Sequence, residues 1–201
     1  MGRQPWLTKT LNTGNPLERL DGYRIAFLGK PVQVVARSLA LLGADLAQIG
    51  PGADVPLNPE LISKFDALWV CDDPPGALDV EAVIDFLRTW DGERKPIILV
   101  GDSVGRWLRA APPRGLLVTG PEDVRELATQ SGQRWVDAPV VADGHIVTAR
   151  SSDESGYTIE CALELFLIHQ RTGETAPPEP GARPSGKPAG AAPPGIPESG
   201  S

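Results

Sequence analysis

Residues 135–150 read WVDAPVVADGHIVTAR, and this stretch does most to decide the fold. Its apolar residues alternate on both sides of Asp143-Gly144, and Asp-Gly between alternating apolar residues is a strong signal of a β-hairpin. The preceding run, PEDVRELATQSGQRW, has the spacing of an amphipathic helix. We therefore predict a helix over residues 121–130, followed by two short strands joined at Asp143-Gly144 and closed by a threonine and an arginine.

The chain before this stretch alternates between strand-like and helix-like runs. The expected strands are YRIAFL, ADLAQIG, ALWVC, PIILVG and LLVTG, and the expected helices are VVARSLALLGA, DVEAVIDFLRTW and VGRWLRAA, with a last helix over about residues 156–170. Such alternation implies a parallel sheet between helices. We predict an α/β fold: a flavodoxin-like three-layer sandwich with a mostly parallel sheet and a β-hairpin near the C-terminal end.

Composition divides the 201 residues into one domain and two tails. Residues 1–20 are polar and are expected to be a flexible lead-in, and residues 21–173 are expected to form the domain. Residues 174–201 are almost wholly Pro, Gly, Ala, Ser and Glu, a composition typical of disorder.

Charge and motif content exclude several classes of function. The formal net charge is −7 without a basic cluster, so no nucleic-acid partner is expected. No signal peptide and no apolar run of about 18 residues is found, which favours a cytoplasmic protein without membrane contact. Cys71 and Cys161 have no metal-binding spacing and are expected to be buried thiols. We expect no metal and no cofactor.

The helix and hairpin resemble the carboxy-terminal signature of the DJ-1/PfpI superfamily, with its class I glutamine amidotransferase-like fold, in which "aGa-WvD-pvVvDgnlvTsR" follows a helix. The resemblance is specific over residues 95–150 and weak before about residue 60. It implies a nucleophilic Cys on a sharp strand-to-helix elbow. The family spacing from Lys95 to Thr119 places that position on Gly101, and no Asp or Glu lies between Ile25 and Gly43 to supply the family's acidic residue.

The resemblance therefore predicts a degenerate member that lacks the nucleophile. In a parallel sheet the functional site lies at the carboxyl ends of the central strands. We expect ligand-binding residues there, namely Gly101, Asp102, Ser103, Asp72 and Asp73. The predicted function is that of a non-catalytic binding or oligomerisation module. The partner would be a second copy or another protein, since oligomers are common in the resembled family. Trp69, Trp90, Trp107 and Trp135 are expected in the core, with Trp90 and Trp107 as alternative markers of a dimer surface.

Two alternatives remain open. Residues 101–105, GDSVG, match G-x-S-x-G between a strand and a helix, so Ser103 is an alternative nucleophile of a hydrolase. Such an enzyme needs a base, and neither His145 nor His169 is an obvious partner; otherwise Asp102 and Ser103 are expected to cap the helix that follows. Residues 36–54, ARSLALLGADLAQIGPGAD, resemble the opening of type III CoA-transferases, over the first quarter of the chain.

Overall fold

Six strands form the central sheet of the computed structural model, which describes residues 19–50, 53, 55–72 and 80–172. In sheet order the strands are β2 (Asp45–Ile49), β1 (Arg24–Leu28), β3 (Ala67–Val70), β4 (Ile97–Val100), β8 (Ile146–Ala149) and β7 (Val140–Asp143). Every neighbouring pair is parallel except β7 and β8, which are antiparallel. The predicted mostly parallel sheet is confirmed.

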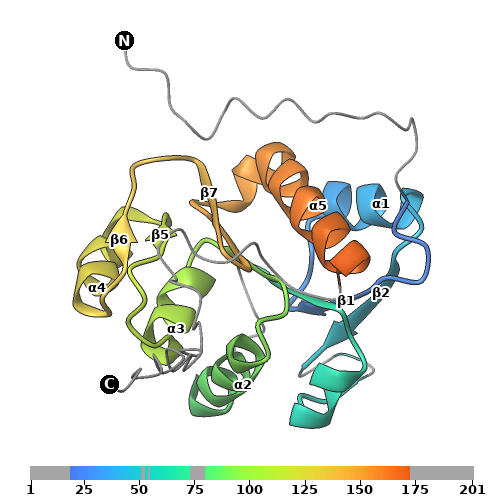
Figure 1. Cartoon of the computed structure of the whole chain (residues 1–201), viewed down its shortest axis with the longest axis horizontal. Helices are drawn as coiled ribbons and strands as arrows, with labels where there is room; N and C mark the ends of the chain where they lie inside the picture. Colours follow the sequence, from blue (N-terminus) through green and yellow to red (C-terminus); the bar gives the residue numbers. More distant parts are fainter. Residues whose placement is uncertain (1–18, 51–52, 54, 73–79, 173–201) are drawn as a thin grey trace, which may run out of the picture.

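Helices cover both faces of this sheet (Figure 1). One face carries α1 (Gln33–Leu41) and α5 (Ser155–Thr172), and the other carries α2 (Val80–Gly92) and α3 (Ser103–Ala110). Short 3-10 helices lie at Pro59–Ser63 (η1), Glu122–Val124 (η2) and Ser152–Glu154 (η3). The predicted three-layer sandwich is therefore confirmed.

The inner strands are buried on both faces, as expected of parallel strands between two helix layers. Side chains of β3 alternate: Leu68 and Val70 join the hydrophobic cluster under α2 and α3, while Trp69 joins the cluster under α1 and α5. The same alternation runs along β1 and β4. This two-sided burial explains why these segments are almost continuously apolar in the sequence.

The decisive stretch forms the predicted hairpin, with one correction. Strands β7 and β8 pair across Asp143 and Ile146, and Gly144 in the turn has φ +62°, which glycine adopts without a Cβ penalty. Trp135, however, lies in β6 (Arg134–Trp135), which pairs with β5 (Leu117–Val118) in a separate two-stranded sheet. The helix predicted over residues 121–130 is split into η2 and α4 (Arg125–Gln130).

The tryptophan predictions have a mixed outcome. Trp69, Trp90 and Trp107 are at most 2% exposed, so their expected place in the core is confirmed. Trp90 and Trp107 are fully buried, and the alternative that they mark a dimer surface is wrong, because both side chains face the sheet.

The ends of the chain bear on the domain limits. Leu20 is already fully buried. The lead-in predicted over residues 1–20 falls almost wholly outside the described residues, and the tail predicted over residues 174–201 falls wholly outside them. Among the helices that the structure describes, none combines the length and the apolar character needed to span a membrane.

Candidate functional site at the carboxyl end of the sheet

The connection between β4 and α3 is an abrupt turn of two residues, Gly101 and Asp102. Gly101 has φ +58°, in the left-handed region that favours glycine. Its backbone N–H donates to the carbonyl of Ala149 on β8 at 3.0 Å, which fixes the turn against the neighbouring strand. A sharp strand-to-helix turn therefore stands where the sequence placed the elbow.

The carboxylate of Asp72 fills the space beside this glycine. A Cβ atom added to Gly101 would overlap Oδ1 of Asp72 and approach the rest of that carboxylate too closely. The same Oδ1 accepts a hydrogen bond from the backbone N–H of Asp102 at 3.1 Å. Asp72 comes from the end of β3, so the structure brings Asp72, Gly101 and Asp102 together as the sequence predicted. Asp73 lies outside the described residues.

Ser103 is turned inward. Its side chain is fully buried, and Oγ accepts the N–H of Val100 at 2.8 Å while lying 2.8 Å from the carbonyl of Val100 and 3.3 Å from that of Val70. The hydroxyl thus donates to a backbone carbonyl and bridges the ends of β3 and β4. The predicted capping is wrong: Asp102 occupies the N-cap position, but its side chain accepts no N–H of α3.

Neither histidine lies beside Ser103. His145 is almost completely buried and contacts Oδ1 of Asp91 through Nε2 at 3.0 Å. His145 directly precedes β8, and β8 runs parallel to β4. It therefore lies at the amino ends of these strands, whereas the elbow lies at their carboxyl ends. His169 on α5 contacts the Tyr23 hydroxyl through Nδ1 at 2.8 Å, and burial lowers its pKa. The two histidines thus support packing.

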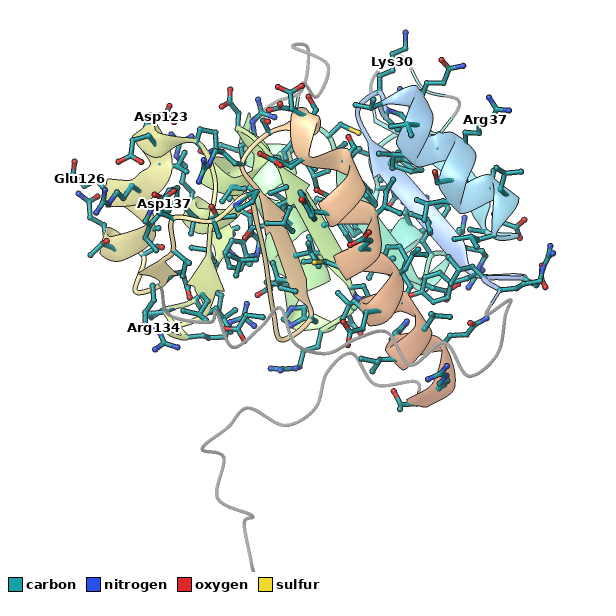
Figure 2. The ribbon with its side chains drawn as sticks, turned by 90° about the horizontal axis from the view of Figure 1, so that it is seen from above. Lys30, Arg37, Asp123, Glu126, Arg134 and Asp137 are labelled. Atoms are coloured by element: carbon teal, nitrogen blue, oxygen red, sulfur yellow. The ribbon has the colours of Figure 1, made fainter. Side chains whose placement is uncertain are left out.

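A cavity of about 150 Å³ lies next to the elbow, between the starts of α1 and α5. It is lined by Lys30, Val32, Val35, Trp69, Cys71, Asp72, Val100, Ser151, Ser152, Ser155 and Thr158. We call it the elbow pocket. Its walls are largely apolar, with the Asp72 carboxylate and a group of hydroxyls on them. Lys30 contributes to the lining but projects outward from the ribbon (Figure 2).

The elbow pocket contains a thiol that is held protonated. Cys71 is 5% exposed, and burial together with the charge of Asp72 raises its pKa to about 12. Because the thiolate is the nucleophilic form, this cysteine is inert near neutral pH. Within the described ranges no three His, Cys, Asp or Glu side chains form a group that could hold a metal ion.

Sequence reasoning missed one wall of the elbow pocket. Ser151 and Ser152 come from the segment that joins β8 to α5, and Ser155 and Thr158 lie at the start of α5. Strand β8 lies next to β4 in the sheet, so the residues that follow it must meet the elbow. The signal was the run SSDES directly after Arg150, since clustered serines after a buried strand mark a turn at the sheet edge.

Of the comparisons with known proteins, only the one with solved structures found similar proteins. No protein-family model matches the sequence, and no curated protein matches it either. Among solved structures, a two-domain protein from Anabaena variabilis with DJ-1/ThiJ/PfpI-like and ferritin-like domains superposes with a TM-score of 0.59 at 17% identity, over 80% of this chain and 52% of that one. This chain thus spans about half of that protein's length.

Two further solved structures match over almost their full length. A DJ-1 superfamily protein from Salmonella typhimurium has a TM-score of 0.53 at 21% identity, over 77% of this chain and 92% of its own. A ThiJ/PfpI domain protein from Brachyspira murdochii has a TM-score of 0.56 at 15% identity, over 74% and 96%. This chain has the DJ-1/PfpI fold. At these identities the likeness establishes the fold and leaves the chemistry to the residues of this chain.

Proposed function

We propose that this chain is a non-catalytic DJ-1/PfpI-like domain that acts as a binding module and takes a small ligand in the elbow pocket. One observation carries the proposal. The volume that a side chain at position 101 would need is filled by the carboxylate of Asp72. The elbow therefore offers a fixed carboxylate and a pocket in place of a nucleophile.

The size of the elbow pocket limits the ligand. A volume of about 150 Å³ corresponds to roughly five water molecules at about 30 Å³ each. A ligand of about five non-hydrogen atoms binds with at most about 1.5 kcal/mol per atom, hence a Kd of several micromolar at best. We therefore expect weak binding.

The lining sets the chemical class of the ligand. Val35, Trp69 and Val100 favour a branched apolar body. Asp72 favours a hydroxyl or ammonium group over a second carboxylate, because two like charges close together repel each other. An alcohol or amine with a short branched chain fits both conditions.

A titration followed by amide NMR tests the proposal. The probes are isobutanol, isobutylamine and isobutyrate, added to the full chain. We expect the alcohol and the amine to shift the amide signals of Val100, Ser155 and Thr158, and the carboxylate to bind at least several-fold more weakly. Ser152→Leu, which fills the elbow pocket from η3, should abolish the shifts.

A matched control is available on another 3-10 helix. Ser63 closes η1, is exposed and lies away from the elbow pocket, so Ser63→Leu should bind the probes as the unmodified chain does. Absence of shifts in the unmodified chain, or shifts that survive Ser152→Leu, would refute the proposal.

The alternative of a Ser103 hydrolase is tested in parallel with a serine-reactive activity probe and a small-ester assay. Because Oγ of Ser103 is buried and bonded to the backbone, we expect neither labelling nor turnover. Labelling that disappears in Ser103→Ala would establish the hydrolase instead.

A further inference from the structure

A second hollow lies between α3 and the segment formed by η2 and α4. Helices α3 and α4 are neighbours in the fold (Figure 1), and the groove between them has a volume of about 480 Å³. It shares no lining residue with the elbow pocket. We call it the α3–α4 groove and define it by Arg106 and Arg109 on α3 and by Asp123, Glu126 and Gln130 on η2 and α4.

The floor of the α3–α4 groove is apolar and closely packed. Gly105 of α3 is buried, and a Cβ atom added there would lie only 3.0 Å from Cγ1 of Val124 on η2. The absence of a side chain at position 105 therefore lets α3 and η2 approach each other. Val124 is buried and Leu127 is half-buried, and both line the groove beside this glycine. The groove is thus built on packed elements, as pre-formed ligand sites are.

The two walls of the groove carry opposite charges. Arg106 and Arg109 are three residues apart on α3, so they share one face of that helix. Asp123 and Glu126 have the same spacing where η2 continues into α4. Within the part of the chain that the structure describes, none of these four side chains takes part in an ion pair. Neither wall therefore neutralises the other.

Arg106 is partly removed from water without a counter-charge. Its side chain is half-buried, Nη1 is inaccessible to solvent, and no acceptor among the described residues forms a hydrogen bond with that atom. A guanidinium keeps its charge at any ordinary pH, and removing a charge from water without a partner is costly. A carboxylate that binds the part of Arg106 facing the groove would offset this cost.

The acidic wall determines what else the ligand must carry. A simple anion would meet the carboxylates of Asp123 and Glu126, and a third at Asp102 at the start of α3, whereas a simple amine would meet two guanidinium groups. Like charges at close range repel each other. We propose that the α3–α4 groove binds a small zwitterion, with its carboxylate on Arg106 and Arg109 and its ammonium group on the acidic wall. This inference does not depend on the ligand proposed for the elbow pocket.

The straight-chain amino acid 4-aminobutyrate is a suitable probe. A volume of about 480 Å³ corresponds to roughly sixteen water molecules at about 30 Å³ each, so this molecule fits with room to spare. Exposed ion pairs contribute little, so we expect a dissociation constant of ~1–10 mM. Added to the full chain, the probe should shift the amide NMR signals of Gly105, Leu127 and Gln130. Butyrate and butylamine have the same chain with one charge each, and both should bind several-fold more weakly.

A reversal of charge on one wall tests the pairing. Arg106→Glu/Arg109→Glu makes both walls acidic, so 4-aminobutyrate should no longer bind. The dication 1,4-diaminobutane should then shift the same amides more strongly than it does in the unmodified chain, a gain that loss of structure cannot produce. The matched control is Arg37→Glu/Arg88→Glu, which changes the net charge equally at exposed positions of α1 and α2 outside the groove. It should bind all probes as the unmodified chain does.

The readouts separate this proposal from that of the elbow pocket. Asp123 and Glu126 lie at the opposite end of the domain from Lys30 (Figure 2), and ligands of the elbow pocket shift other amides. Far-ultraviolet dichroism verifies folding. If the double variant does not fold, Arg109→Glu alone, at an exposed position, should still weaken 4-aminobutyrate several-fold.

Three results would each overturn the proposal of a zwitterion site. The first is the absence of shifts at the groove amides with ~50 mM 4-aminobutyrate. The second is equal binding of 4-aminobutyrate and either singly charged probe. The third is undiminished binding of 4-aminobutyrate by the charge-reversed variants.

Discussion

Gly101 and Asp72 share one small volume at the end of β4, and this determines which residues the elbow tolerates. The left-handed φ of Gly101 costs a non-glycine residue about 1–2 kcal/mol. An added Cβ must also displace the carboxylate of Asp72 from its hydrogen bond to Asp102.

We therefore predict that Gly101→Ala lowers the free energy of unfolding by about 2–3 kcal/mol. In a chain that also carries Asp72→Ala the overlap is gone and the backbone cost alone remains. The double variant should therefore be about 1 kcal/mol more stable than the sum of the single changes implies. Urea unfolding of the four proteins measures this coupling. Strictly additive effects would show that the two residues do not compete.

Ser103 acts on the backbone of its own elbow. Its hydroxyl accepts a hydrogen bond from the N–H of Val100 inside the core, so its removal deletes a buried hydrogen bond at the end of β4. We predict that Ser103→Ala costs about 1–3 kcal/mol in the free energy of unfolding, measured by urea denaturation. Ser131→Ala, which removes a half-buried hydroxyl bonded to the Ala128 carbonyl, is the control and should cost less. An unchanged midpoint for Ser103→Ala would contradict the bridging role.

At the scale of elements, Asp91 joins α2, the hairpin and the loop before β5. Its carboxylate oxygens accept hydrogen bonds from Nη2 of Arg114 at 2.6 and 2.7 Å, and Oδ1 lies 3.0 Å from Nε2 of His145. The side chain is nearly inaccessible, and removing one partner of a buried pair leaves an uncompensated charge.

We predict that Asp91→Asn lowers the free energy of unfolding by about 3 kcal/mol. Asp85→Asn lies on the same helix and breaks an exposed pair with Arg88, so it should cost less than about 1 kcal/mol. Chemical denaturation of both variants measures the difference. Similar losses in the two would show that burial of the network is unimportant.

The Asp91 carboxylate also makes the stability of the fold depend on pH. Burial raises the pKa of Asp91, but the hydrogen bonds from His145 and Arg114 outweigh it and hold the pKa below its ordinary value. A lowered folded pKa contributes stability above the unfolded value of about 3.9 and loses it as pH falls through the folded pKa. We expect the urea midpoint of the unmodified chain to drop more between pH 5 and pH 2 than that of Asp91→Asn. Parallel curves would rule out this contribution.

The sequence predicts elements well and contacts across the sheet poorly. Apolar runs and Asp143-Gly144 are local signals, and the structure has strands and a hairpin where they stand. The contact of Asp72 with Asp102 spans 30 residues, and it could be predicted because strand ends in a parallel sheet share one edge. The contact of Asp91 with His145 spans 54 residues and joins a helix end to a hairpin, which no local pattern indicates.

On the scale of the whole molecule, the fold has one large sheet and one small one. The large sheet is stabilised by helices on both faces. The small sheet consists of β5 and β6, two residues each, and a two-stranded sheet alone is marginally stable in water. The backbone hydrogen bonds from the N–H of Arg134 to the carbonyl of Leu116 and from the N–H of Val136 to the carbonyl of Val118 lengthen this small sheet only slightly.

Native-state hydrogen exchange should resolve this difference. We expect the amides of Ile98 and Leu99 in β4 to exchange through global unfolding, with the full free energy and full dependence on denaturant. The amides of Arg134 and Val136 should exchange through a local opening, with a lower free energy and a weak dependence on denaturant, because few strand bonds hold them. Equal free energies and equal denaturant slopes for both sets would mean that β5 and β6 unfold with the central sheet. The small sheet would then belong to the same cooperative unit as the elbow.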